Sequence, residues 1–236
     1  MPLVPAPTDV LCLYAAYLAR FLLPQSVYCY IRFVGILHLE HGFSNPLTDN
    51  WVISTVLKGI RRVYGVPARP RLPMTVSLLC NIRSHLNLNC SKHASFWAIC
   101  LTMFFGLFRK SHLLVESSPK FNSKQQFTRA DFTQDTYGYL LAVRWSKTIQ
   151  MGQRIVFIPL LPFPQHPLCP VTAISQALFL SPAAHSGSQA FCYQDGPLLV
   201  SRFTYKAFMN LLRSTLLKSG VCPSDYGTLS FRRGGA

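Results

Sequence analysis

The sequence predicts a mainly α protein, in which an all-α first part precedes an α+β part with a small antiparallel sheet. Apolar residues recur with a helical period through most of the chain before Gly65. Short segments in which apolar and polar residues alternate occur only later, at 139–145 and 154–159. Residues 66–71 (VPARPR) form a stiff basic linker between these parts. We therefore expect two domains, 1–70 and 71–236.

The first part is expected to consist of three helices. Asp9 is a candidate N-cap of the first helix, and Pro24 opens the second. Gly42 and Gly65 stand where the second and third helices should end. The three predicted helices span residues 9–22, 27–40 and 51–64.

The second part mixes helices with one hairpin. Thr75, Ser91 and Ser201 are candidate N-caps of three helices. Pro170 opens another helix, which should run to about Leu180. The other predicted helices run to about 86, to about 108 and over 203–217, and residues 146–153 connect the two alternating segments as a hairpin.

Charge points to a polyanionic partner. The chain has 23 Lys and Arg against 8 Asp and Glu, which gives a net charge of +15 with neutral histidine. Residues 1–71 hold seven basic and three acidic residues, and the remainder holds sixteen and five. Half of the residues are hydrophobic, so a disordered polyelectrolyte is excluded. Nucleic acid is the first candidate partner and an anionic membrane surface is the second.

The apolar segments are too short to predict a membrane span. The longest, 96–108, is well below the roughly 20 residues that a bilayer requires, and 10–19 is shorter still. Both are therefore expected to be buried helices. The N-terminus has three prolines and no basic leader, so no secretory signal is predicted and a nuclear or cytoplasmic location is expected.

Cysteine and histidine spacings give no support for a metal site. The eight cysteines include no CxxC pair, and several lie in apolar helical segments. They are expected to be buried, reduced thiols. His38 and His41 have an HxxH spacing without the glutamate position of HExxH. No metal and no other cofactor are expected.

Five basic residues before and within the linker are candidates for DNA contact. A solvated helix face is the ordinary interpretation of such a cluster, but the stiff basic linker that follows favours contact with a polyanion. The third predicted helix places its basic residues opposite an apolar stripe of Val52, Val56, Ile60 and Val63. The candidate DNA-binding residues are Lys58, Arg61, Arg62, Arg69 and Arg71.

Three further basic residues stand in local settings that suit a phosphate site. Arg109 follows an apolar helix in the segment GLFRKS, Lys147 lies in the predicted hairpin, and Arg232 lies in LSFRRGGA. Taken singly, they also fit a solvated helix end, an exposed turn and a surface arginine pair.

Taken in order, these segments resemble the tyrosine recombinase (phage-integrase-like) family, with most similarity to recombinases of DIRS-like and Crypton-like mobile elements. GLFRKS is similar to the block around the first catalytic arginine of that family. SK at 146–147 with GQRIVFIPL at 152–160 is similar to its lysine-bearing hairpin, and LSFRRGGA to its His-x-x-Arg block. PLCPVTA at 167–173 and LKGIRR at 57–62 extend the resemblance over nearly the whole chain.

The resemblance implies DNA recombination and integration by phosphotyrosine strand transfer on double-stranded DNA. Arg109, Lys147 and Arg232 would be its catalytic residues. Two guanidiniums would hold the non-bridging phosphate oxygens, and the lysine would protonate the departing 5′ oxygen. Residues 1–70 would be a core-binding-like domain and 71–236 a catalytic-like domain. A homo-oligomer on DNA is also implied.

The sequence departs from the family pattern at several positions. Leu229 stands where the family has a histidine, and His112 where many relatives have an acidic or amide residue. None of the ten tyrosines follows Arg232, and the first core-binding helix is expected to be missing. We interpret the chain as a fragment or decayed reading frame of a mobile element, which alone should not cleave DNA.

Other functions stay open. One is a non-enzymatic basic protein that binds anionic membrane through the amphipathic helix 203–217, although its apolar face is large enough to be core. Another is RNA binding, for which Tyr137, Tyr139 and Trp145 are candidates, although a core role fits them better. No GxSxG, Walker-type or GxGxxG motif supports a hydrolase or nucleotide-binding enzyme.

Overall fold

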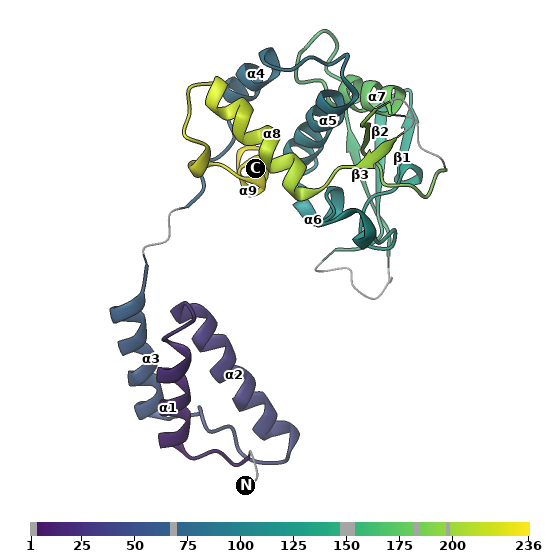
Figure 1. The fold of residues 1–236 in the computed structure, drawn as a ribbon. Coiled ribbons are helices and arrows are strands. Elements are labelled where there is room, and N and C mark those ends of the chain that lie inside the picture. Colours follow the sequence, from purple (N-terminus) through teal and green to yellow (C-terminus); the bar gives the residue numbers. More distant parts are fainter. Residues whose placement is uncertain (1–3, 67–69, 147–153, 182–184, 197–198) are drawn as a thin grey trace. The chain divides into compact units, whose positions relative to one another are not determined.

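The computed structural model describes residues 4–66, 70–146, 154–181, 185–196 and 199–236. The chain divides into two compact units, Met1–Ala68 and Arg69–Ala236, called unit 1 and unit 2 below. Unit 1 is helical, and unit 2 combines helices with small antiparallel sheets (Figure 1). The fold is therefore α-rich α+β, as predicted from the spacing of apolar residues.

Unit 1 is built from helices that each pack one face against a shared apolar core. Pro24 occupies the first turn of its helix, and Gly42 has a φ of 79° just after the end of that helix. Asp9 lies in the first turn of its helix and not at the N-cap, which is Pro7. The helices are α1 (Thr8–Leu18), α2 (Pro24–Glu40) and α3 (Trp51–Tyr64), and their buried core is Leu11, Ala15, Ala19, Val27, Ile31, Ile53 and Ile60.

One expectation about unit 1 was wrong, and another holds only in part. The run 10–19 is not a buried helix, because Leu13 and Tyr17 are mostly exposed. A unit this small has one core and cannot cover every face of its helices. The predicted apolar stripe of α3 holds only in part: Ile60 is buried and Val56 packs against the core, whereas Val52 and Val63 are exposed and Ile53 is buried instead. Ile53 and Ile60 stand seven residues apart, so the inward face of the helix is turned by about one residue from the predicted one.

The histidine pair in unit 1 has a structural role. His38 is buried, and its Nδ1–H donates to the Val34 carbonyl at 2.7 Å. Its Nε2 accepts from the Ala6 backbone N–H at 2.9 Å. His41 contacts the Leu37 carbonyl within its own helix. Both nitrogens of His38 are therefore used by the backbone.

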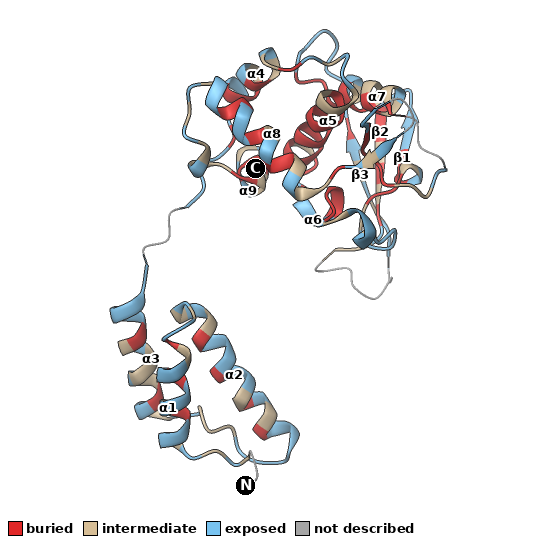
Figure 2. Ribbon diagram, in the orientation of Figure 1, coloured by how far each residue is buried: buried red, intermediate tan, exposed pale blue. Residues whose placement is uncertain are grey.

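Unit 2 is organised around one apolar helix, α5 (Ser91–Phe105). Every residue over 94–104 is buried (Figure 2). The expectation that 96–108 would be buried is confirmed for this helical part, although the helix ends three residues early. The surrounding helices are α4 (Val76–Ser84), α6 (Lys110–Leu113), α7 (Pro170–Leu180), α8 (Tyr205–Lys218) and α9 (Thr228–Gly234).

The predicted hairpin is present and has a third strand beside it. Strand β2 (Gly138–Val143) pairs antiparallel with β3 (Val156–Leu160), with Leu141 opposite Ile158. Strand β1 (Phe132–Asp135), which the sequence did not indicate, pairs with the other edge of β2. A separate pair is formed by β4 (Cys192–Gln194) and β5 (Val200–Arg202).

Helix caps show where local signals were sufficient. Thr75 caps α4 by accepting from the Leu78 N–H at 3.2 Å, as predicted. Helix α8 is capped by Thr204, which accepts from the Ala207 N–H at 3.2 Å, and not by Ser201, which lies in β5. Helix α5 has Cys90 at its N-cap position, so Ser91 is its first helical residue and not its cap. In both cases strand pairing or packing places the helix start one or more residues away from the predicted cap.

The cysteines are all free, and three of them are buried: Cys100, Cys169 and Cys192. Cys29, Cys90 and Cys222 are exposed, so the expectation of burial holds for only part of the set. Among the described residues, none of the helices combines the length and apolar character that a membrane crossing requires.

Candidate phosphate-binding site

Arg109 is held in place by the aromatic residue before it. Helix α5 ends at Phe105, the chain turns through Leu107 at a φ of 54°, and Phe108 is buried. The Phe108 ring packs edge-on against Phe127, with 4.9 Å between centroids. Arg109 follows as the N-cap residue of α6 and is exposed. A buried anchor therefore holds an exposed guanidinium at the end of the central helix.

Arg232 is brought to the same end of α5 by close packing of α9. Phe231 is fully buried, with its ring 6.1 Å from that of Phe208. A Cβ added at Gly234 would collide with the Met74 backbone, and one at Gly235 with the Phe104 backbone. Gly234 lets the end of α9 approach the segment before α4, and Gly235 lets the chain just after α9 approach the main chain of α5. Figure 1 shows α6 and α9 beside the same end of α5.

Besides burial, the charges of Arg109 and Arg232 both lower the pKa of His112. The His112 side chain is 7% exposed, and neither of its ring nitrogens has a hydrogen-bond partner of normal geometry among the described residues. Burial lowers the pKa of His112 below its ordinary value, and the charges of Arg109 and then Arg232 lower it further, while the Trp145 backbone acts in the opposite direction. Two arginines far apart in sequence therefore lie within electrostatic range of one imidazole. We call Arg109 and Arg232 the arginine pair.

The β2–β3 hairpin also contributes a residue beside His112. The Trp145 ring, just after β2, lies 6.3 Å from the His112 ring between centroids. Lys147, the third predicted catalytic residue, lies outside the described residues. The structure thus brings together the arginine pair, His112 and Trp145, which stands two residues before Lys147.

The acidic group nearest to His112 is already paired. Asp131 is buried and accepts from the Thr128 N–H at 2.7 Å and from the Thr128 hydroxyl at 2.9 Å. Arg144 donates to the same carboxylate at 2.5 Å. Neither ion pair found among the described residues includes Arg109 or Arg232. The positive charge of the arginine pair is therefore not neutralised by a protein carboxylate in the described part of the chain.

A basic groove of about 490 Å³ lies next to the site. Tyr205 and Arg213 of α8 line it together with Leu229, which stands one helical turn before Arg232. The Lys110 ammonium lies 3.9 Å from the centre of the Tyr205 ring. Leu229 is about half exposed and offers no hydrogen-bond donor at this position.

The predicted DNA-binding residues occupy different settings. Lys58 and Arg61 line a groove of about 340 Å³ between α2 and α3 in unit 1, and Arg62 is exposed on α3. Arg71 donates to the carbonyls of Ser224 and Tyr226 in unit 2, so its guanidinium holds a loop. Arg69 lies outside the described residues.

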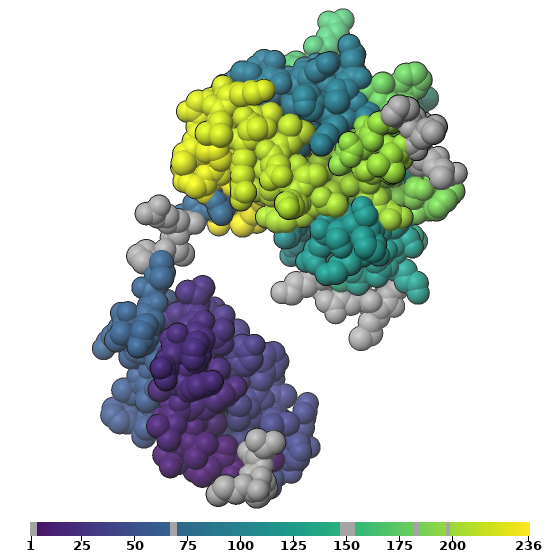
Figure 3. Space-filling model, in the orientation of Figure 1, coloured from purple at the N-terminus to yellow at the C-terminus, as the bar shows by residue number. Residues whose placement is uncertain are grey.

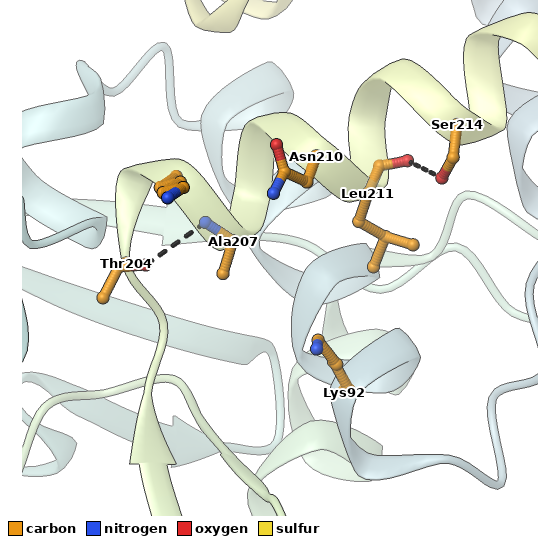
Figure 4. Close-up of a pocket in the computed structure, with 7 residues that line it drawn as sticks. Lys92, Thr204, Ala207, Asn210, Leu211 and Ser214 are labelled. Atoms are coloured by element: carbon orange, nitrogen blue, oxygen red, sulfur yellow. Dashed lines mark hydrogen bonds between the residues drawn. The ribbon is translucent and has the colours of Figure 1, made fainter.

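A second basic hollow, of about 450 Å³, opens where α8 passes the start of α5. Figure 4 shows Lys92 of α5 opposite Asn210 and Ser214 of α8. The Lys92 ammonium contacts the face of the Tyr193 ring at 4.8 Å. No described group at this hollow combines burial with an unused hydrogen bond, so it is a weaker candidate than the arginine pair.

Sequence reasoning identified the arginine pair and missed His112 as a member of the site. His112 could have been predicted from its position three residues after Arg109, because this spacing places the two residues on the same short helix, α6. The chain was also compared with models of known protein families and with curated proteins, and nothing matches it.

Proposed function

We propose that this protein binds double-stranded DNA through a phosphate site of the tyrosine-recombinase type, built on Arg109 and Arg232. The observation that carries the proposal is that these two guanidiniums, far apart in sequence, both act on the charge of one buried imidazole, and that neither forms an ion pair with a carboxylate among the described residues. Guanidiniums keep their charge and bind phosphate oxygens in a forked geometry. Lys147 is included in the proposed site on the resemblance alone.

Charge on both units supports an extended contact with DNA. Lys58, Arg61 and Arg62 lie on one helix of unit 1, and the whole chain carries a net charge of +15. Contacts of this kind go to the DNA backbone and set position and affinity more than sequence preference. The proposal covers DNA binding, and strand cleavage is left to experiment.

Arg109→Ala and Arg232→Ala test the proposal. Each should weaken binding to a short duplex by about tenfold, because a charged hydrogen bond to phosphate contributes about 1.5–3 kcal/mol. Fluorescence anisotropy with labelled duplex DNA measures the change. Arg20→Ala is the charge-matched control, since Arg20 is exposed at the end of α1, and it should change affinity far less.

The same titration separates the alternatives. Equal losses in all three variants would contradict a specific phosphate site and leave only non-specific charge attraction. Competition by RNA or by anionic vesicles at lower concentration than DNA would favour the other partners.

Helix α8 offers little to a membrane, because Phe208, Leu212 and Leu216 are fully buried. Tyr139 is buried as expected and Trp145 is half-buried, whereas Tyr137, in the turn between β1 and β2, is mostly exposed and is free to stack on RNA.

A further inference from the structure

The buried imidazole of His112 makes no hydrogen bond of normal geometry within the part of the chain that the structure describes. A polar side chain this deeply buried is normally hydrogen-bonded, since an unpaired group costs about 1–3 kcal/mol. Neither ring nitrogen of His112 has a hydrogen-bond partner of normal geometry among the described residues, although the Trp145 backbone lies close enough to favour the charged ring. The ring packs against the rings of Phe108, Phe127 and Trp145. An apolar ring would fill the same space at lower cost.

The groups that face His112 are almost all cationic. Its own element contributes Arg109, and α9 contributes Arg232. The small cavity beside the ring is also lined by Lys124, Arg144 and Asp131. Asp131 is occupied by Arg144 and Thr128, so no free carboxylate among the described residues compensates a charge on the ring.

We propose that His112 is the third cationic group of the phosphate site and takes up a proton when a DNA phosphate binds to the arginine pair. This inference rests on the proposed function and adds a residue and a proton to it. Without an anion, burial and then the two guanidiniums lower the pKa of His112, which favours the neutral imidazole. A bound phosphodiester introduces a negative charge beside the arginine pair, which favours the imidazolium form. By linkage, a ligand that favours protonation binds more tightly as the pH falls.

The test compares DNA affinity at pH 8.0 and pH 6.0, at constant ionic strength, for the full chain and for His112→Phe. Duplex DNA is the probe because its phosphodiesters keep one charge over this range, whereas inorganic phosphate itself titrates there. We expect the affinity of the unmodified chain to rise by about tenfold between these pH values. His112→Phe keeps the ring contacts and should show a clearly smaller rise, produced by the other histidines alone.

Binding calorimetry in two buffers of different ionisation enthalpy gives a second measurement. The unmodified chain should take up protons on binding DNA near pH 7, and His112→Phe should take up fewer. His112→Gln, which keeps a polar side chain but cannot titrate, replaces His112→Phe in both experiments if the latter fails to fold. An unchanged pH profile and unchanged proton uptake in the variant would overturn the inference.

The outcomes distinguish this inference from the proposed function. Loss of affinity in Arg109→Ala and Arg232→Ala with an unaltered pH profile in His112→Phe contradicts the role of His112 alone. Absence of DNA binding by the unmodified chain at every pH contradicts the proposed function and, with it, this inference.

Discussion

At the scale of single residues, close backbone approach decides where the arginine pair stands. Gly234 and Gly235 have negative φ values, so their identity is explained by contact and not by backbone conformation. The Met74 N–H also donates to the Ser230 carbonyl at 2.8 Å. Together these contacts fix the helix that carries Arg232 between the segment that holds Met74 and the end of the central helix.

Gly234→Ala should therefore destabilise unit 2 by about 1–3 kcal/mol, because the added methyl group must displace the Met74 backbone. DNA affinity should fall with it, since Arg232 moves with α9. Thermal unfolding followed by circular dichroism measures the first effect, and anisotropy measures the second. Gly59→Ala is the matched control: its added Cβ meets nothing within 4 Å in helix α3, so it should stabilise by up to about 1 kcal/mol. An unaltered melting temperature for Gly234→Ala would contradict this account.

His112 also predicts how stability depends on pH. Its pKa is lowered in the folded chain, so the unfolded chain binds the proton more readily. The stability associated with the neutral ring is present above the ordinary pKa of about 6.5 and is lost as the pH falls below it. Melting temperatures at pH 7.5 and 5.5 should differ less for His112→Phe than for the unmodified chain. An equal or larger difference in the variant would show that the acid-sensitive group lies elsewhere.

At the scale of elements, strands and loops position the ends of helices. Helix α8 begins at Tyr205 because the Tyr205 N–H donates to the Val115 carbonyl at 2.7 Å and Thr204 caps the first turn. Figure 3 shows the C-terminal segment that contains α8 (yellow) directly against the blue segment of α4. The apolar face of α8 is consequently covered at Phe208, Leu212 and Leu216, which agrees with the interpretation that this face is large enough to be core.

Thr204→Ala should cost about 1 kcal/mol of stability through loss of the cap of α8. Ser214→Ala, on the exposed side of the same helix, removes only a bond to the Leu211 carbonyl and should be neutral or slightly stabilising. Urea unfolding with a shared m-value compares the two variants. Equal losses would mean that the hydroxyl of Thr204 does not act as a cap.

At the scale of the whole molecule, charge on both units predicts salt-dependent binding. Replacing Lys58, Arg61 and Arg62 together by alanine should reduce the slope of log affinity against log salt by up to about 2–3, since each phosphate contact contributes about 0.9. Titrations at several salt concentrations measure this slope. A slope equal to that of the unmodified chain would show that unit 1 makes no phosphate contacts.

Much of the architecture follows from local sequence. Pro170 and Leu180 bound α7 as predicted, because proline favours the first turn and the apolar spacing continues through the helix. The β2–β3 hairpin was predicted from alternation alone. Strand β1 was missed because its residues Thr133, Gln134 and Asp135 are polar and exposed, so alternation is absent.

The sequence by itself determined the net charge, the order of helices and hairpin, and the presence of three basic residues in suggestive surroundings. Only the tertiary structure decided that the charges of Arg109 and Arg232 act on the same imidazole, and that His112 is buried with no hydrogen bond of normal geometry among the described residues. The physical reason is that these contacts join residues distant in the chain. They depend on the packing of the end of α9 against Met74 through Gly234 and against α5 through Gly235, and no periodic pattern in the sequence records that packing.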